Sequence, residues 1–149
     1  MKIYVTGASG TLGKALVERG CLPLDCNIVD EEEVTQKVRE ASPDVLIHCA
    51  AITDVDYCET HFKESFDVNV RGTSNVAVAL PTNALMIYLS TDHVFSGANW
   101  ISSTGYTEKH SPRPVNRYGF SKWGGELALR AHLNHLIVRT SKCYSIPWM

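Results

Sequence analysis

The sequence has no long apolar run, no excess charge of either sign and no metal-binding motif. Its longest apolar stretches have only the length of a strand, which argues against a helix that crosses a membrane. The formal net charge is -2 over 149 residues, so we expect neither a nucleic-acid-binding surface nor a basic tail for a membrane. The six histidines show no spacing such as HExxH, and we expect no metal site.

Cysteines are also few, and their pattern suggests no disulfide framework. The chain has five cysteines, an odd number without a CxxC pair, which is typical of reduced thiols in a cytosolic protein. The N-terminus enters a strand-like segment at once, so we expect no signal peptide and a cytoplasmic location. The length and an ordinary composition, 44% hydrophobic and 20% charged, predict one globular domain over residues 1–149.

Short apolar segments alternate with segments of helical spacing along the chain. The apolar segments read as buried parallel strands and cover residues 2–7, 44–51, 84–90 and 135–141. The helical segments cover residues 9–19, 30–41, 56–80 and 117–133. Residues 21–29 have room for only one or two very short strands, and residues 91–116 form a long loop of the kind that is usually functional. This alternation predicts an α/β fold with a Rossmann-like, doubly wound parallel sheet.

Local signals mark the helix ends and one buried face. Gly20 is a C-cap candidate, Asp30 with Glu33 three residues later forms a capping box, and Pro43 ends the second helix. The third helical segment carries an apolar stripe that we expect to face the core, made of Phe62, Phe66, Val70, Val76, Ala77 and Leu80.

Three glycines lie between the first strand and the first helix, in the pattern GxxGxxG. Gly7 permits a tight turn, Gly10 lets the backbone approach a phosphate, and Gly13 allows close packing of the helix. The N-terminus of the helix then offers free N–H groups to a pyrophosphate. The pattern predicts a dinucleotide-binding loop; the alternative is a glycine-rich turn without a ligand.

A hydroxyl and a Tyr/Lys pair follow later strands and suggest proton transfer. Thr91 comes just after a strand, and Tyr118 and Lys122 are four residues apart, so a helix places them on one face. An ammonium beside a phenol lowers the phenol pKa and makes Tyr118 a general acid for a forming alkoxide. Lys122 can also hydrogen-bond a nicotinamide ribose, and Thr91 can hold the carbonyl oxygen. Without the glycine loop, the pair would be ordinary residues of a helix surface.

The two residues after Thr91 have two interpretations each. Asp92 orients substrate hydroxyls or caps a turn, and His93 is a second proton donor or a loop residue with a satisfied hydrogen bond. Glu126 is one turn after Lys122, and we expect it to be an ion-pair partner of that lysine.

The sequence leaves the choice between NAD(H) and NADP(H) open. Asp25 and Asn27 are candidates to contact the adenosine half of a cofactor. Lys14 and Arg19 are candidates to face a 2′-phosphate, although a solvated helix face suits Arg19 better.

These motifs together resemble extended short-chain dehydrogenases/reductases, and within them the dTDP-4-dehydrorhamnose reductases. The resemblance covers TGASGTLG, IHCAAITDVD, STDHVFSG and YGFSK. It implies reduction of a 4-keto nucleotide sugar by NADP(H) or NAD(H), with Thr91, Tyr118 and Lys122 as catalytic residues and Thr91, Asp92 and His93 at the substrate. It also implies a set of cofactor-binding residues, namely Gly7, Gly10, Thr11, Leu12, Gly13, Asn27, Ile28, Ala50, Ala51, Thr53, Tyr118 and Lys122.

The chain departs from the family pattern at three points. His93 stands where the family usually has tyrosine, Lys142 where it has tryptophan, and Ser145 where it has glycine. The family also continues into a smaller C-terminal substrate domain, which we expect to be mostly absent here. The apolar residues 146–149 are then expected to be exposed or to pack over the sheet edge, which favours a homodimer or other self-association.

Two other functions remain open at this point. One is a non-catalytic NAD(P)-binding regulatory subunit resembling that of methionine adenosyltransferase, and the other is a nucleotide-sugar epimerase or dehydratase.

Overall fold

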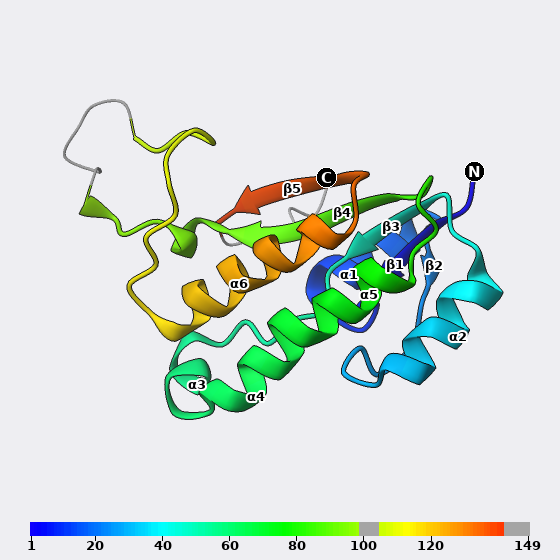
Figure 1. The fold of residues 1–149 in the computed structure, drawn as a ribbon, viewed down its shortest axis with the longest axis horizontal. Helices are drawn as coiled ribbons and strands as arrows, with labels where there is room; N and C mark the ends of the chain where they lie inside the picture. Colours follow the sequence, from blue (N-terminus) through cyan, green and yellow to red (C-terminus); the bar gives the residue numbers. More distant parts are fainter. Residues whose placement is uncertain (99–104, 142–149) are drawn as a thin grey trace, which may run out of the picture.

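A computed structural model describes residues 1–98 and 105–141 as a sheet of five parallel strands with helices on its faces (Figure 1). The strand order is β2-β1-β3-β4-β5. The strands are β1 Ile3–Thr6, β2 Leu22–Pro23, β3 Val45–His48, β4 Leu85–Thr91 and β5 His135–Thr140. The predicted α/β, Rossmann-like fold is therefore confirmed, and the compressed segment 21–29 holds one very short strand.

The helices connect successive strands, as the alternating pattern predicts. They are α1 Thr11–Glu18, α2 Glu31–Ala41, α3 Val55–Thr60, α4 Phe62–Phe66, α5 Thr73–Ala79 and α6 Arg117–Ala128. A π-helical turn, Asp67–Gly72, joins α4 to α5, and short 3₁₀ turns cover Asp92–Val94 and Leu129–Ala131. In the described ranges, no helix has both the length and the apolar character that a membrane crossing requires.

The direction of each crossover decides which face a helix covers. The connection from β1 to β2 runs one way along the sheet, and the next three run the other way. Since such crossovers are right-handed, α1 covers one face, and α2, α5 and α6 cover the other. These three helices pack side by side, α2 on α5 and α5 on α6. The order reverses between β1 and β3, and ligands of doubly wound sheets bind beyond the carboxyl ends of such strands.

The core lies between the sheet and the layer of α2, α5 and α6. Along β3 and β4 every second side chain points into this layer, so Leu46, Met86 and Tyr88 are fully buried. Val38 of α2 and Val76 of α5 pack there as well.

The C-terminal end of α1 forms as predicted, and of the capping box predicted for α2 only the half made by the Asp30 side chain forms. Gly20, with φ +96°, follows α1, and its N–H donates to the Val17 carbonyl while that of Cys21 reaches Leu16, which is a Schellman motif. The side chain of Asp30 accepts the N–H groups of Glu32 and Glu33 at the start of α2. The Asp30 N–H donates to the Asn27 carbonyl at 2.9 Å, so a turn satisfies this group.

The apolar stripe predicted for the third helical segment is only partly correct. Val76, Ala77 and Leu80 are buried, but Phe62, Phe66 and Val70 are half-buried. The most deeply buried residues of α4, the π-helical turn and the start of α5 are instead polar: Ser65, Asn69 and Thr73. Each has hydrogen-bond partners inside the protein, which allows its burial.

Candidate active site

The glycine loop has a backbone that side chains would disrupt. Gly7 has φ +67°, and a Cβ there would lie 2.7 Å from the Ala50 nitrogen. A Cβ on Gly13 would overlap the carbonyl oxygen of Gly7. The Gly10 N–H donates to that same carbonyl at 3.0 Å, which closes the turn. The two outer glycines thus keep the start of α1 against the end of β1.

A cleft runs along the carboxyl ends of the strands. Its larger part is a cavity of about 580 Å³, a size typical of ligand sites. That part is lined by Gly7, Gly10, Thr11, Leu12, Gly13, Cys49, Ala51, Thr53, Val55, Leu89, Ser90, Thr91, Asp92, His93, Tyr118, Lys122, Thr140 and Ser141. An adjoining cavity of about 390 Å³ is lined by Gly7, Ala8, Ser9, Leu24, Asp25, Cys26, Asn27, Ile28, Val29, Ala50, Ala51, Ile52 and Val68.

The structure brings all the predicted cofactor residues to this cleft. Gly7 and Ala51 line both cavities, and the two cavities therefore meet at the glycine loop. Lys14 and Arg19 line neither cavity, and the Arg19 guanidinium donates to the Ala15 carbonyl of its own helix. Among the lining residues that were not predicted are Thr140 and Ser141; their place at the end of the last parallel strand was the available signal.

Thr91 lies at the end of β4 and organises the next turn. Its side-chain oxygen accepts the His93 N–H at 3.2 Å, and its hydroxyl donates to the Asp92 carboxylate at 3.2 Å. Thr91 thus caps the 3₁₀ turn. The hydrogen bond of its hydroxyl is accepted by the exposed carboxylate of Asp92. A ligand carbonyl would have to replace Asp92 as the acceptor of this hydrogen bond.

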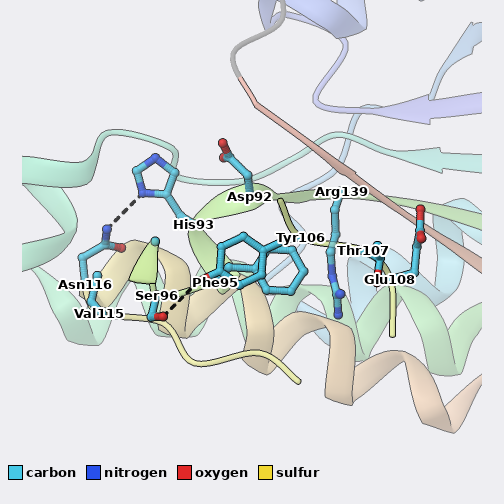
Figure 2. A pocket seen from close by; sticks show the side chains of 11 residues that line it. Asp92, His93, Phe95, Ser96, Tyr106, Thr107, Glu108, Val115, Asn116 and Arg139 are labelled. Carbon is cyan, nitrogen blue, oxygen red and sulfur yellow. Dashed lines mark hydrogen bonds between the residues drawn. The ribbon is translucent and has the colours of Figure 1, made fainter. Parts of the chain in front are cut away.

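The His93 ring is fixed by Asn116, the N-cap of α6 (Figure 2). The Oδ1 of Asn116 accepts the Gly119 N–H at 2.7 Å, so its amide nitrogen donates to Nδ1 of His93 at 3.0 Å. The predicted satisfied hydrogen bond of His93 is therefore present, and Nε2 carries the proton of the neutral ring. The ring meets Tyr118 edge-on, with centroids 5.5 Å apart.

Tyr118 and Lys122 line the larger cavity together from one face of α6. Both are buried, with 9% and 3% exposure. Burial lowers the pKa of Lys122 to about 7, against the smaller opposite effects of Cys49 and Glu126. The ammonium lies 4.2 Å from the centre of the Tyr88 ring, a cation–π contact that favours the charged form.

The predicted ion pair between Lys122 and Glu126 is wrong. Glu126 accepts two hydrogen bonds from the Arg139 guanidinium, at 2.8 and 2.7 Å, and one from the Ser90 hydroxyl at 2.6 Å. The planar fork of arginine matches a carboxylate better than an ammonium does, and β5 brings Arg139 beside this part of α6. Sequence spacing along one helix could not reveal a partner on a distant strand.

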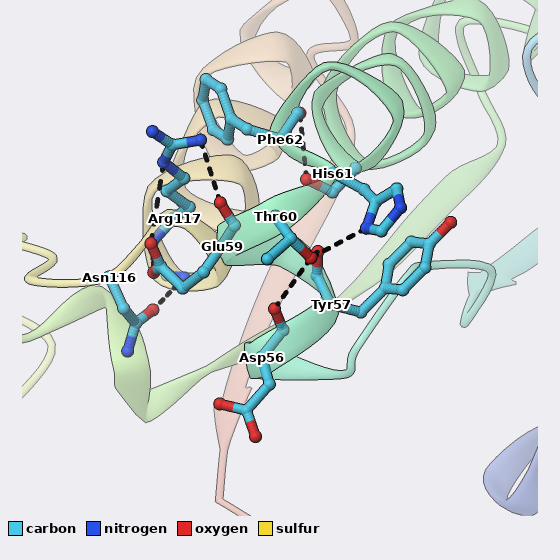
Figure 3. Close-up of polar contacts among 10 residues, drawn as sticks. Asp56, Tyr57, Glu59, Thr60, His61, Phe62, Asn116 and Arg117 are labelled. Atoms are coloured by element: carbon cyan, nitrogen blue, oxygen red, sulfur yellow. Dashed lines mark hydrogen bonds and ion pairs between the residues drawn. The ribbon is translucent and has the colours of Figure 1, made fainter.

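A contact between α3 and α6 fixes where the Tyr118 helix begins (Figure 3). The Arg117 N–H donates to the Glu59 carboxylate at 2.7 Å, and its guanidinium donates to the Glu59 carbonyl at 3.0 Å. The guanidinium also lies 5.3 Å from the centre of the Phe62 ring.

A further cavity of about 590 Å³ begins at Asp92 and His93, which it shares with the cleft. Phe95 and Tyr106 stack in its wall with centroids 4.4 Å apart, and the Arg139 guanidinium lies 5.1 Å from the Phe95 ring (Figure 2). The arrangement gives a ligand room beside Thr91 and Tyr118, on aromatic and charged walls.

The fold and the cleft define a Rossmann-type protein with a ligand-sized site at the carboxyl ends of its strands. Residues 1–147 match the family model described as the RmlD substrate binding domain, and the chain belongs to this family.

Similar proteins include dTDP-4-dehydrorhamnose reductases and the beta subunit of methionine adenosyltransferase 2. The chain is 36% identical to dTDP-4-dehydrorhamnose reductase of Mycolicibacterium smegmatis, over 96% of this chain and 46% of that protein. It is 33% identical to methionine adenosyltransferase 2 subunit beta of Danio rerio, over 88% and 44%. The crystal structure of dTDP-4-dehydrorhamnose reductase from Bacillus anthracis in complex with NADP has a TM-score of 0.87 and 40% identity, covering 95% of this chain and 54% of that one. The chain thus spans about half the length of the relatives it matches.

Proposed function

We propose that this protein is an NAD(P)H-dependent reductase of a 4-keto nucleotide sugar, of the dTDP-4-dehydrorhamnose reductase type, within the short-chain dehydrogenases/reductases. One observation carries the proposal: a continuous cleft joins Asn27 to Tyr118, with the glycine loop at its middle. The NADP complex of the similar reductase from Bacillus anthracis supports the choice of cofactor.

The residues of the cleft fit such a cofactor from end to end. Asn27 and Ile28 take the adenosine end, and the start of α1 faces the pyrophosphate with free N–H groups. Gly7 and Gly13 let the backbone of the loop pack closely and keep its shape, because a Cβ at either position would overlap neighbouring backbone atoms. The remaining cavity, with Thr53 and Lys122 in its walls, takes the nicotinamide end.

The chemistry then follows from three side chains. Bound NAD(P)H supplies the hydride. Tyr118 gives a proton to the oxygen of the sugar carbonyl, and Thr91 orients that oxygen through its hydroxyl. Lys122 holds the ribose and, when charged, lowers the pKa of Tyr118; an anionic cofactor nearby favours this charged form. Asp92 and His93 face the sugar from the cavity beyond.

A single hydroxyl deletion tests the role of Tyr118. Tyr118→Phe should remove turnover, followed as NADPH absorbance with a dTDP-4-dehydro sugar, while NADPH affinity by fluorescence stays nearly unchanged. Tyr57→Phe is the matched control, because its hydroxyl donates to the exposed Glu64 and it does not line the cleft. Full turnover in Tyr118→Phe would show that the mechanism is wrong.

A second candidate is a non-catalytic NAD(P)-binding regulatory subunit. The similarity to methionine adenosyltransferase 2 subunit beta supports it, as does His93 at a position where tyrosine is usual in the reductases. NADPH binding without oxidation, over several nucleotide sugars, would favour this function. A cofactor that is recycled during turnover would favour an epimerase or dehydratase instead.

We also propose a cytoplasmic location. Within the described residues, Cys21, Cys26, Cys49 and Cys58 form no disulfide, the state expected in a reducing compartment.

A further inference from the structure

A column of polar side chains is buried beneath the cleft. Thr6, His48, Thr73, Asn69 and Ser121 are each at most 1% exposed, and they come from β1, β3, α5, the π-helical turn and α6. Burying a polar group without a partner is costly. Here each group has one, and the partners form a continuous series of hydrogen bonds.

The direction of these hydrogen bonds fixes the tautomer of His48. The hydroxyl of Thr73 has one hydrogen, which goes to the Asn69 carbonyl at 2.8 Å. The Thr73 oxygen must therefore accept from Nε2 of His48, 3.1 Å away, so that Nε2 carries a proton. Burial lowers the pKa of His48 to about 3, so the ring is neutral and its Nδ1 carries no hydrogen.

Nδ1, the other ring nitrogen of His48, is linked to the wall of the cleft through Thr6. Nδ1 of His48 accepts the hydroxyl hydrogen of Thr6 at 2.7 Å, and the Thr6 oxygen accepts the Ala50 N–H at 3.3 Å. Ala50 in turn lies directly against Gly7 of the glycine loop. A change at Nδ1 therefore acts on the backbone at the point where the two cofactor cavities meet.

On the far side the series reaches the Tyr118 helix. The Oδ1 of Asn69 accepts the Ile52 N–H at 2.8 Å, which orients the amide. Its nitrogen donates to the Ile52 carbonyl and to the Ser121 oxygen, both at 2.9 Å. The Ser121 hydroxyl donates to the Tyr118 carbonyl at 2.8 Å. One network thus holds residues 50–52 and the backbone of Tyr118.

We propose that His48, locked as the Nε2–H tautomer, is a positioning residue that holds the cofactor-binding wall at residues 50–52 in register with the helix of Tyr118. This inference rests on the proposed binding of NAD(P)H for its functional consequence. The tautomer itself follows from the hydrogen bonds of a buried, neutral ring. The imidazole suits the role because it offers an acceptor to Thr6 and a donor to Thr73 in one rigid ring.

Two amide substitutions separate the two halves of this role in the full chain. His48→Asn keeps an acceptor near the position of Nδ1 and should bind NADPH within about threefold of the wild type. His48→Gln keeps a donor near the position of Nε2 but loses the Thr6 contact, so it should bind about tenfold more weakly. Thermal unfolding is measured for both variants, because a merely structural role would make affinity follow stability. Equal affinities in the two variants, or affinities that follow their melting temperatures, would overturn the proposal.

A measurement on the wild type keeps the inference testable if a variant fails to fold. NMR of the chain with ¹⁵N-labelled histidine should show His48 as the Nε2–H tautomer, unchanged from about pH 5 to about pH 8. A protonated Nδ1, or titration of His48 in that range, would refute the hydrogen-bond directions. A wild type that shows this tautomer but does not bind NADPH would contradict the proposed function and the proposed positioning role, and would leave only the structural assignment.

Discussion

The pair between Glu126 of α6 and Arg139 of β5 should contribute strongly to stability. The Glu126 side chain is 4% exposed and that of Arg139 is 20% exposed. One carboxylate oxygen accepts from Ser90 and from Nε of Arg139, and the other accepts from the second guanidinium nitrogen. Glu126→Gln preserves the size of the side chain but sets an amide N–H against one of these donors.

The expected cost of Glu126→Gln is about 2–3 kcal/mol. A hydrogen bond to a charged group contributes about 1.5–3 kcal/mol, and breaking a fully buried ion pair costs about 3–5 kcal/mol. Arg139 keeps some contact with water, so the low end of the second range applies. Urea unfolding near neutral pH measures the loss as a lower midpoint with an unchanged slope.

Glu40→Gln is the matched control, because Glu40 is exposed on α2 and the same chemical change there should cost under about 0.5 kcal/mol. A double variant with Arg139→Met should lose less than the sum of the two single losses. If Glu126→Gln unfolded at the same urea concentration as the control, the reasoning from burial and hydrogen-bond count would be refuted.

Three further predictions concern the loop, a lysine and the assembly. Gly13→Ala should weaken NADPH binding at least about tenfold, because its methyl group overlaps the Gly7 carbonyl; unchanged affinity by fluorescence would contradict the assigned loop. Burial lowers the pKa of Lys122 from 10.5 to about 7, so the unfolded chain binds a proton that the folded chain releases in this range. The unfolding free energy should rise from about pH 7 to about pH 10, relative to Lys122→Met, by up to about 1.4 kcal/mol per pH unit; parallel curves would argue against the shift. Self-association, predicted from residues 146–149, should appear in light scattering as a mass above that of the monomer. These residues lie outside the described ranges, as do Lys142 and Ser145.

Much of the site could be predicted because it depends on short-range patterns. The glycine loop joins one strand to the next helix, and Tyr118 and Lys122 are one helical turn apart, so their relation follows from local geometry. Parallel strands place their carboxyl ends at one sheet edge, and that is why Thr91 could be assigned to the same cleft.

Only the tertiary structure decided which buried groups meet. Glu126 pairs with Arg139 because β5 lies beside β4, and a helix pattern within α6 carries no information about that neighbour. Asn69 and Thr73 are buried because they have polar partners on α6, β3 and the loop after β3. Ser65 is buried because its hydroxyl donates to the Phe62 carbonyl of its own helix. Sequence by itself determined the fold class and placed the predicted cofactor and catalytic residues in one cleft, since periodicity and turn chemistry act locally. The proton arrangement of His48 depends on partners at both ring nitrogens, which are distant in sequence and come together only when the sheet and its helices pack.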